Sequence, residues 1–309
     1  MILNTGCRTD IPAFYSDWFL RRVQAGFVLT RNPYRPEQVL QYHLAPDVVD
    51  VLCFCTKNPA PMLPHMAQLR AFRQFWFVTL TPYGKEIEPF VPDKASVVQS
   101  IQRLSALLGR KAVCWRYDPI FLTEKYDIAF HLQVFARLAA ALSGSVSACV
   151  ISFLDLYEKT KRNFPDGHAV SPDEQRLLVR QFVQIGAKYG ISIRTCCENP
   201  SLALQGADVS GCMTQAVLES AIGCRLRVPK SRKSPRTQCN CLLGADIGMY
   251  NTCPHGCVYC YANADRAAVV AQCRQHDPAS PFLIGGFRSG DTIVPVHQES
   301  YIDPQLSFL

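Results

Sequence analysis

VVDVLCFC at residues 48–55 and FWFVTLT at residues 75–81 are short apolar runs that are rich in β-branched and aromatic side chains. Runs of this length and composition are typical of β-strands that are buried on both faces. Four further runs share this character: MILNT (1–5), AVCWRYD (112–118), ACVISFLD (148–155) and ISIRTCC (191–197). The sequence therefore predicts six buried strands before residue 198.

Helical patterns separate the predicted strands. In residues 94–108 apolar residues recur at helical spacing, and Gly109 supplies a C-terminal stop. The sequence Ser-Pro-Asp-Glu at 171–174 predicts a helix start, with Ser171 as the N-cap of a capping box and Pro172 at the first helical position. Strands that are joined by crossover helices pair in parallel, so we expect an α/β fold, either a barrel or a doubly wound sheet.

The polar residues that follow the apolar runs favour the barrel. The carboxyl ends of barrel strands converge on one mouth, where such folds carry their chemistry. We therefore expect a six-stranded, partial barrel similar to a TIM barrel. Four residues at strand ends are the catalytic candidates for its mouth: Arg116, Asp118, Lys57 and Glu198. The alternative for each of them is an ordinary solvated loop residue.

The composition is that of a globular protein, with 48% hydrophobic and 18% charged residues among 309. The net charge of +7 permits an anionic partner without requiring one. The first residues lack the basic region of a signal peptide, and no run reaches the roughly 18 apolar residues of a membrane span. We therefore expect a cytoplasmic protein without a membrane partner.

The composition changes after residue 224. Residues 225–238 contain six basic residues and no acidic residue. This pattern predicts three parts: a barrel domain (1–224), a basic linker (225–238) and a C-terminal cysteine-bearing segment with a tail (239–309). The linker is either a solvated connector or a patch that binds phosphate or nucleic acid.

Three of the fifteen cysteines, Cys253, Cys257 and Cys260, are spaced C-x3-C-x2-C within the sequence NTCPHGCVYCYAN (251–263). A short loop with this spacing can direct three thiolates to one centre. A four-iron four-sulfur (4Fe-4S) cluster held by three cysteines keeps one iron open for another ligand. A structural zinc site needs four ligands and would also recruit Cys239 or Cys241.

A second group of cysteines lies upstream of this loop. Cys239 and Cys241 form C-x-C, Cys196 ends the sixth predicted strand, and Cys212 lies in the loop that follows. If these four thiols gather at the same mouth, they would ligate a second iron–sulfur cluster. The alternative is that Cys196, Cys197 and Cys212 are core or loop thiols. Four cysteines inside apolar runs are expected to be buried: Cys53, Cys55, Cys114 and Cys149.

The motif with Tyr259 directly before its last cysteine resembles the signature of the radical S-adenosylmethionine (radical SAM) superfamily. Its wider form, CPHGCVYCYAN, is similar to the branch that includes spore photoproduct lyase and related putative DNA repair lyases. The cluster loop of most of that superfamily follows the first barrel strand, whereas here it follows the barrel pattern. Over nearly its full length the chain resembles an uncharacterised bacterial family with a radical-SAM-like cysteine cluster at its C-terminus.

The resemblance implies a cofactor set and a reaction. It implies a 4Fe-4S cluster at the three cysteines, S-adenosylmethionine on the open iron, and cleavage of that molecule to a 5'-deoxyadenosyl radical. It also implies adenine packing by Tyr259 and Tyr261, and an electron donor such as a flavodoxin or ferredoxin. The reversed order requires the C-terminal segment to fold back over the barrel mouth.

Two functions from different classes remain open at this stage. The first is a radical SAM enzyme of unknown substrate, with a repair-like reaction on nucleic acid as one option. The second is a nucleic-acid-binding protein that is stabilised by zinc or a cluster and has no catalytic activity. His255 lies within the cysteine loop and is expected to shape the loop rather than to ligate a metal.

Overall fold

The computed structural model describes residues 1–156, 158–230, 239–242 and 244–304. It is built on a seven-stranded parallel sheet in the order β8-β7-β6-β5-β4-β1-β9. The strands of this sheet are β1 (Ile2–Asn4), β4 (Val51–Thr56), β5 (Gln74–Thr79), β6 (Val113–Ile120), β7 (Ala148–Phe153), β8 (Ser192–Thr195) and β9 (Ala245–Asp246). All six predicted strands are confirmed, and β9 is an addition.

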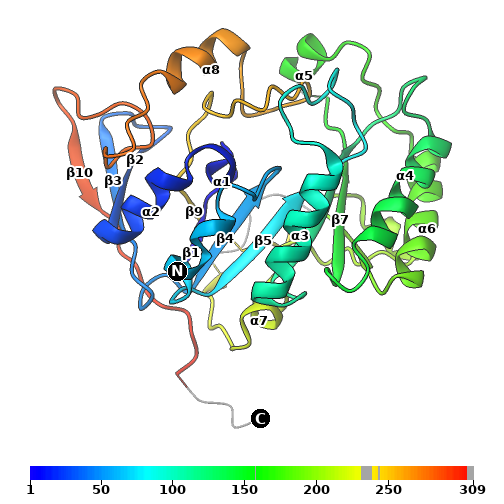
Figure 1. Cartoon of the computed structure of the whole chain (residues 1–309), viewed down its shortest axis with the longest axis horizontal. Coiled ribbons are helices and arrows are strands. Elements are labelled where there is room, and N and C mark those ends of the chain that lie inside the picture. Colours follow the sequence, from blue (N-terminus) through cyan, green and yellow to red (C-terminus); the bar gives the residue numbers. More distant parts are fainter. Residues whose placement is uncertain (157, 231–238, 243, 305–309) are drawn as a thin grey trace.

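Helices separate most of these strands (Figure 1). They are α1 (Ile11–Phe14), α2 (Ser16–Ala25), α3 (Lys94–Leu108), α4 (Ile128–Ala141), α5 (Glu158–Asn163), α6 (Pro172–Lys188), α7 (Gln215–Ile222) and α8 (Arg266–Cys273), with 3-10 helices at Leu63–Leu69 and Pro200–Gln205. The sequence predicted α3 with its stop at Gly109, and the capping box of Ser171 and Glu174 that begins α6; both are confirmed. None of the helices among the described residues is long and apolar enough to cross a membrane.

The sheet is open within the described residues, so the α/β class is confirmed and a closed barrel is not formed. β8 and β9 are the two edges. The outer edge of β8 is already hydrogen bonded to a loop residue: the Thr195 N–H donates to Asp208 O at 3.0 Å, and the Asp208 N–H donates to Ile193 O at 2.8 Å. Because this edge is occupied by Asp208, β8 has no free edge to pair with β9.

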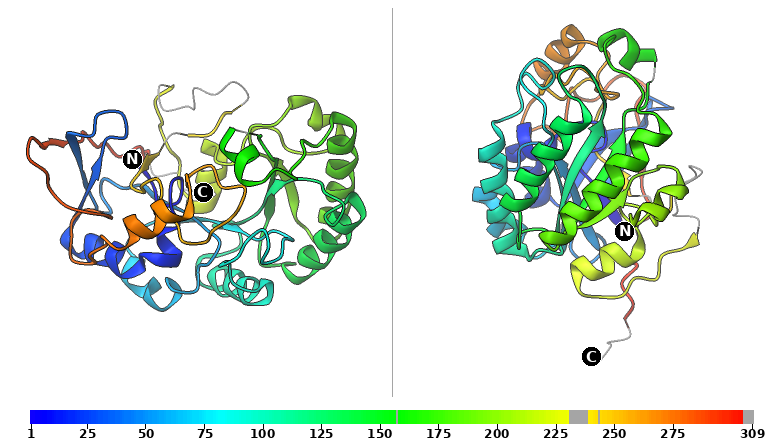
Figure 2. Two further views of the ribbon diagram at one scale, coloured as in Figure 1. Left: turned by 90° about the horizontal axis from the view of Figure 1, so that it is seen from above. Right: turned by 90° about the vertical axis from the view of Figure 1, so that its right-hand side faces the viewer.

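Aromatic stacking joins the sheet to its outer helices. Phe54 and Trp76 stack at 4.1 Å between ring centroids, and Phe135 of α4 stacks on Trp115 at 4.7 Å and on Phe182 of α6 at 4.1 Å. Viewed from above, α2, α3, α4 and α6 follow the outer side of the sheet (Figure 2), and α8 lies above α1 in the view of Figure 1.

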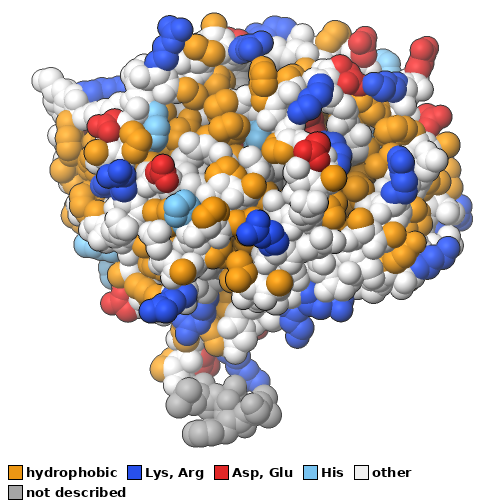
Figure 3. All heavy atoms as spheres, in the orientation of Figure 1, with side chains coloured by type: hydrophobic (Ala, Val, Ile, Leu, Met, Phe, Trp, Pro, Cys, Tyr) orange, Lys and Arg blue, Asp and Glu red, His pale blue; other side chains and the backbone are white. Residues whose placement is uncertain are grey.

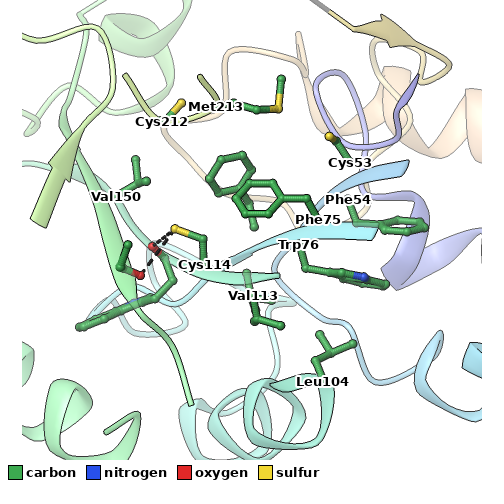
Figure 4. Packing of buried hydrophobic residues seen from close by; sticks show 14 of the residues in the cluster. Cys53, Phe54, Phe75, Trp76, Leu104, Val113, Cys114, Val150, Cys212 and Met213 are labelled. Atoms are coloured by element: carbon green, nitrogen blue, oxygen red, sulfur yellow. Dashed lines mark hydrogen bonds between the residues drawn. The ribbon is translucent and has the colours of Figure 1, made fainter. Parts of the chain in front are cut away.

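The opposite face of the sheet is covered by segments from the second half of the chain. Cys53 and Phe75 lie on the side of Cys212 and Met213, whereas Trp76 points toward Leu104 of α3 (Figure 4). The same core cluster also contains Leu226, Leu242, Leu283 and Tyr301 from beyond residue 224. The C-terminal residues therefore pack on the first 224 residues and share their core.

The sequence analysis missed a small second sheet of order β10-β3-β2. Its strands are β2 (Phe27–Arg31), β3 (Gln38–His43) and β10 (Thr292–Pro295). β2 and β3 form an antiparallel pair, and β10 pairs with β3 in parallel. This sheet attaches residues 292–295 beside α2 and away from α4 and α6 (Figure 1).

Candidate functional site

Residues 251–263, here called the cluster loop, lie between β9 and α8. The loop is hydrogen bonded to segments that follow strands of the sheet. The Phe90 N–H donates to His255 O at 3.1 Å, the Val258 N–H donates to Ile87 O at 3.1 Å, and the Tyr261 hydroxyl donates to Cys7 O. The C-terminal segment therefore crosses the carboxyl edge of the sheet, and the sequence analysis had expected it to fold back over these strand ends.

His255 holds the cluster loop against the end of β4. Its side chain is buried, and Nε2 lies 2.8 Å from Oδ2 of Asp10. The same carboxylate oxygen accepts the Lys57 N–H at 2.8 Å, while Oδ1 accepts the Ala13 N–H that begins α1. Asp10 therefore joins three segments, and His255 shapes the loop.

The three motif cysteines share one electrostatic neighbourhood. Burial, followed by the charge of Asp10, raises the pKa of the Cys253 thiol well above its usual range, and Cys257 and Cys260 add to that rise. Burial raises the pKa of Cys257 to about 12. Metal binding at these thiols must therefore displace protons. Among the described residues, no group of three or more His, Cys, Asp or Glu side chains is arranged to hold a metal ion as it stands.

Two buried oxygen atoms near the loop suit an additional ligand. Among the described atoms, Oγ1 of Thr9 and Oδ1 of Asn263 are buried without a hydrogen-bond partner. Asn263 belongs to the cluster loop and donates through Nδ2 to Cys253 O at 2.8 Å, and Thr9 directly precedes Asp10. A buried polar atom without a partner is costly, so a ligand that donates hydrogen bonds here would remove that cost.

Glu88 is the main residue of this site that the sequence analysis missed. Its carboxylate is 1% exposed and accepts hydrogen bonds from Lys57 Nζ at 2.8 Å and Lys94 Nζ at 2.8 Å. The hydroxyls of Thr81 and Tyr259 donate to it as well. Burial alone would raise the pKa of Glu88, but the charges of Lys57 and Lys94 outweigh it and hold that pKa far below its usual range. Glu88 is therefore ionised.

The two tyrosines of the motif have different environments. Tyr259 is 8% exposed, and its ring packs with Tyr83 and Phe121 at centroid distances of 6.1 and 6.2 Å. Lys57 Nζ lies 5.5 Å from the centre of the same ring. Tyr261 is 55% exposed. The ring of Tyr261 is therefore accessible to a ligand, whereas Tyr259 is enclosed by other side chains.

Asp118 interacts with each of the other three catalytic candidates. Arg116 donates to it through Nε at 3.0 Å, and its carboxylate interacts electrostatically with both Lys57 and Glu198. Ser152 of β7 donates to its other oxygen. Arg116 and Asp118 belong to β6, whereas Lys57 follows β4 and Glu198 follows β8. The structure thus brings the four side chains to the same edge of the sheet.

Glu198 has the opposite electrostatic environment to Glu88. Burial raises its pKa to about 8, and the charges of Asp155 and Asp118 act in the same direction. A hydrogen bond from the Phe153 N–H, 2.8 Å long, opposes that rise. A carboxyl group with this pKa is largely protonated at pH 7 and can donate a proton.

The second cysteine group is also brought together. Cys212 Sγ lies 3.4 Å from Cys196 Sγ and 3.3 Å from Cys241 Sγ, and the Cys239 side chain hydrogen bonds to Cys241. A hydrogen bond with Cys212 lowers the pKa of Cys241 to about 6 and that of Cys196 to about 7. The predicted burial of the strand cysteines is confirmed for Cys53, Cys114 and Cys149, and Cys55 is partly buried.

The described part of the basic linker ends at Lys230, and three of its basic residues, Arg232, Lys233 and Arg236, lie outside the described residues. On the face shown in Figure 3, Lys and Arg side chains are dispersed among acidic and apolar ones. This face therefore does not present the continuous basic surface that favours nucleic-acid binding.

Comparison with known proteins gives a family without an assigned activity. Residues 2–262 match the domain of unknown function DUF1848, a range that includes the whole carboxyl edge of the sheet and the three motif cysteines. No curated protein and no solved structure matches the chain. Because the match spans most of the sequence, the chain belongs to the DUF1848 family.

Proposed function

We propose that this protein is a radical S-adenosylmethionine enzyme with a 4Fe-4S cluster on Cys253, Cys257 and Cys260. The observation that carries the proposal is the position of the cluster loop: its C-x3-C-x2-C motif lies against the carboxyl edge of the parallel sheet, within electrostatic range of Lys57. In this proposal the open sheet is the partial barrel that encloses the reaction.

A cluster held by three cysteines supplies an open iron at which S-adenosylmethionine can be bound and reduced. Residues of the chain supply the rest of the proposed cofactor site. The loop thiols give up their protons on binding, and the exposed ring of Tyr261 is available to pack against adenine. The unpartnered oxygens of Thr9 and Asn263 can accept hydrogen bonds from the bound cofactor.

The substrate side of the site contains both charge and a proton donor. Arg116 and Asp118 form a partly buried ion pair that can orient a polar substrate, and Lys57 keeps its charge through Glu88. Glu198, protonated near neutral pH, is suited to donate a hydrogen bond to a substrate oxygen. An external electron donor such as a flavodoxin or ferredoxin belongs to the proposal.

The test is anaerobic incubation of the iron- and sulfide-reconstituted protein with S-adenosylmethionine and dithionite, with quantification of 5'-deoxyadenosine. We expect formation by the unmodified protein and loss in each of Cys253→Ala, Cys257→Ala and Cys260→Ala. Cys273→Ala is the matched control, because its thiol lies close to the cluster loop, 3.6 Å from Thr252 O, but outside the motif.

Full 5'-deoxyadenosine yield from any of the three motif variants would contradict the proposal. So would a reconstituted wild type that binds about four irons at the loop and does not cleave S-adenosylmethionine. A colourless zinc protein that binds nucleic acid, with affinity falling steeply as salt rises, would instead support the non-catalytic alternative.

A further inference from the structure

Three segments that are far apart in the sequence bring four thiols into contact on the inner face of the sheet. Cys196 directly follows β8, Cys212 precedes α7, and Cys239 and Cys241 lie in the stretch 239–242. Cys212 Sγ is in contact with both Cys196 Sγ and Cys241 Sγ, at 3.4 and 3.3 Å. Cys239 completes the group through its hydrogen bond to Cys241.

The backbone around these thiols is built to hold them. The Met213 N–H donates to Cys241 Sγ at 3.2 Å, and the Leu242 N–H donates to Met213 O at 2.9 Å. Gly211 has a φ of 122°, and a Cβ at this position would lie 3.4 Å from Cys241 Sγ and 3.2 Å from a methyl group of Thr214. Only glycine adopts this φ readily, so Gly211 lets Cys212 turn toward Cys241.

We propose that Cys196, Cys212, Cys239 and Cys241 bind one tetrahedral zinc ion, separate from the cluster loop. Two sulfurs on one zinc, each about 2.3 Å from the metal, stand about 3.8 Å apart. The observed sulfur contacts need to open by only a few tenths of an ångström to reach that geometry.

The contact distances argue against the second iron–sulfur cluster that the cysteine pattern first suggested for the same four residues. In a 4Fe-4S cube each cysteine binds a different iron, so the four sulfurs must stand much farther apart than ligands of one ion. Cys212 is 6% exposed and packs in the core beside Met213 (Figure 4). Placing a cube here would require these packed segments to separate.

The charge balance of the site is also consistent with one divalent ion. Binding of Zn²⁺ by four thiolates displaces the protons that the thiols still hold and leaves a net charge of −2 on the zinc–thiolate group. Arg116 interacts electrostatically with Cys196 and Cys212 and supplies positive charge next to the group. The ion would attach the 239–242 stretch to the end of β8, and so secure the segment that leads to the cluster loop.

The experiment measures zinc, iron and acid-labile sulfide in the full chain after expression with both metals supplied. Four proteins are compared: the wild type, Cys253→Ser/Cys257→Ser/Cys260→Ser, Cys196→Ser/Cys212→Ser/Cys241→Ser, and Cys224→Ser as the matched control. We expect one zinc per chain in the wild type, the control and the cluster-loop variant, and loss of zinc from the second triple variant. Zinc-edge absorption of the cluster-loop variant should show four sulfur neighbours at about 2.3 Å.

A second measurement does not depend on the folding of a triple variant. The cluster-loop variant is stripped of zinc by a chelator under reducing conditions and titrated with Co²⁺, which should give the thiolate charge-transfer absorption of a tetrahedral four-sulfur site at one equivalent.

Iron and sulfide in place of zinc in the cluster-loop variant would overturn the proposal in favour of a second cluster. A metal-free chain with a disulfide from Cys212 to Cys196 or Cys241 would overturn it in favour of a redox pair. Both results are independent of 5'-deoxyadenosine formation, so the zinc site and the proposed radical chemistry can fail separately.

Discussion

The two sides of the carboxyl edge balance their buried charge in opposite ways. Beside the cluster loop, Glu88 is ionised, and Lys57 and Lys94 bind its two carboxylate oxygens at 2.8 Å. Beside Cys196, burial and the charges of Asp155 and Asp118 disfavour the ionised form of Glu198, and its pKa rises to about 8. Two carboxyl groups at one site whose pKa values are driven apart are suited to different roles.

This difference indicates that the two sides of the carboxyl edge have different roles. The ion cluster of Glu88 fixes Tyr259 and hence the cluster loop, because the tyrosine hydroxyl donates to the same carboxylate. The side near β8 instead holds an exchangeable proton on Glu198 and the packed thiols around Cys212. We expect substitutions on the loop side to remove cofactor chemistry or local order, and substitutions near β8 to change proton transfer or stability.

The largest expected effect separates the two cysteine groups. Cys257→Ala should lower 5'-deoxyadenosine formation at least 100-fold, a barrier increase of about 2.7 kcal/mol or more, because two cysteines cannot retain the cluster. Cys241→Ala should keep the activity within about fivefold, roughly 1 kcal/mol, because it leaves all three loop ligands intact. The measurement is initial rate after anaerobic reconstitution. Equal losses in the two variants would remove the distinction between the groups.

The next effect concerns stability on the loop side. Glu88→Gln leaves the ammonium groups of Lys57 and Lys94 without their anionic partner, and Lys57 is largely buried. Because removing one partner of a buried ion pair leaves a desolvated charge, we expect the free energy of unfolding to fall by about 3 kcal/mol. Urea unfolding of the wild type and the variant at pH 7 measures this difference.

Glu86→Gln is the matched control for Glu88→Gln. Glu86 lies two residues earlier, is about half exposed, and pairs with Lys125 at the surface. Surface pairs contribute little, so its replacement should leave the urea midpoint almost unchanged. If the control variant is as unstable as Glu88→Gln, the burial of the Glu88 carboxylate is not the reason for the loss of stability.

Glu86 and Glu88 also show where sequence reasoning ends. The segment KEIEPF contains both, and nothing in their local pattern separates an exposed surface pair from a buried ion cluster. Glu88 differs because Lys57, from the end of β4, and Lys94, at the start of α3, meet it in the folded chain. The contacts of Glu88 with Lys57 and Thr81, and with Tyr259 of the cluster loop, are set by tertiary structure alone.

Sequence patterns correctly predicted the structural features that depend only on residues close together in the chain. The capping box at Ser171, the stop at Gly109 and the buried strand runs each depend on neighbouring residues, and the structure confirms them. The pairing of β10 with β3 joins residues about 250 positions apart in sequence, so no local pattern could predict it. The sequence predicted a partial barrel; within the described residues the sheet is open, and Asp208 is hydrogen bonded along the outer edge of β8.

The last expected effect is a pH dependence on the β8 side, and it is spread over several pH units. The folded chain holds a proton on Glu198 up to a pKa of about 8, whereas the unfolded chain loses it near the ordinary value of 4.5. The stability from this group is therefore fully present below about pH 4.5 and is lost as the pH rises toward 8, with a slope of up to about 1.4 kcal/mol per pH unit.

In Glu198→Gln, which can still accept the Phe153 hydrogen bond, urea stability should fall less steeply from pH 5 to 8. Asp155→Asn should make the fall end at a lower pH, because the Asp155 charge helps to raise the pKa of Glu198. Parallel pH profiles in the wild type and Glu198→Gln would mean that Glu198 is ionised like Glu88, and the contrast between the two sides of the edge would not hold.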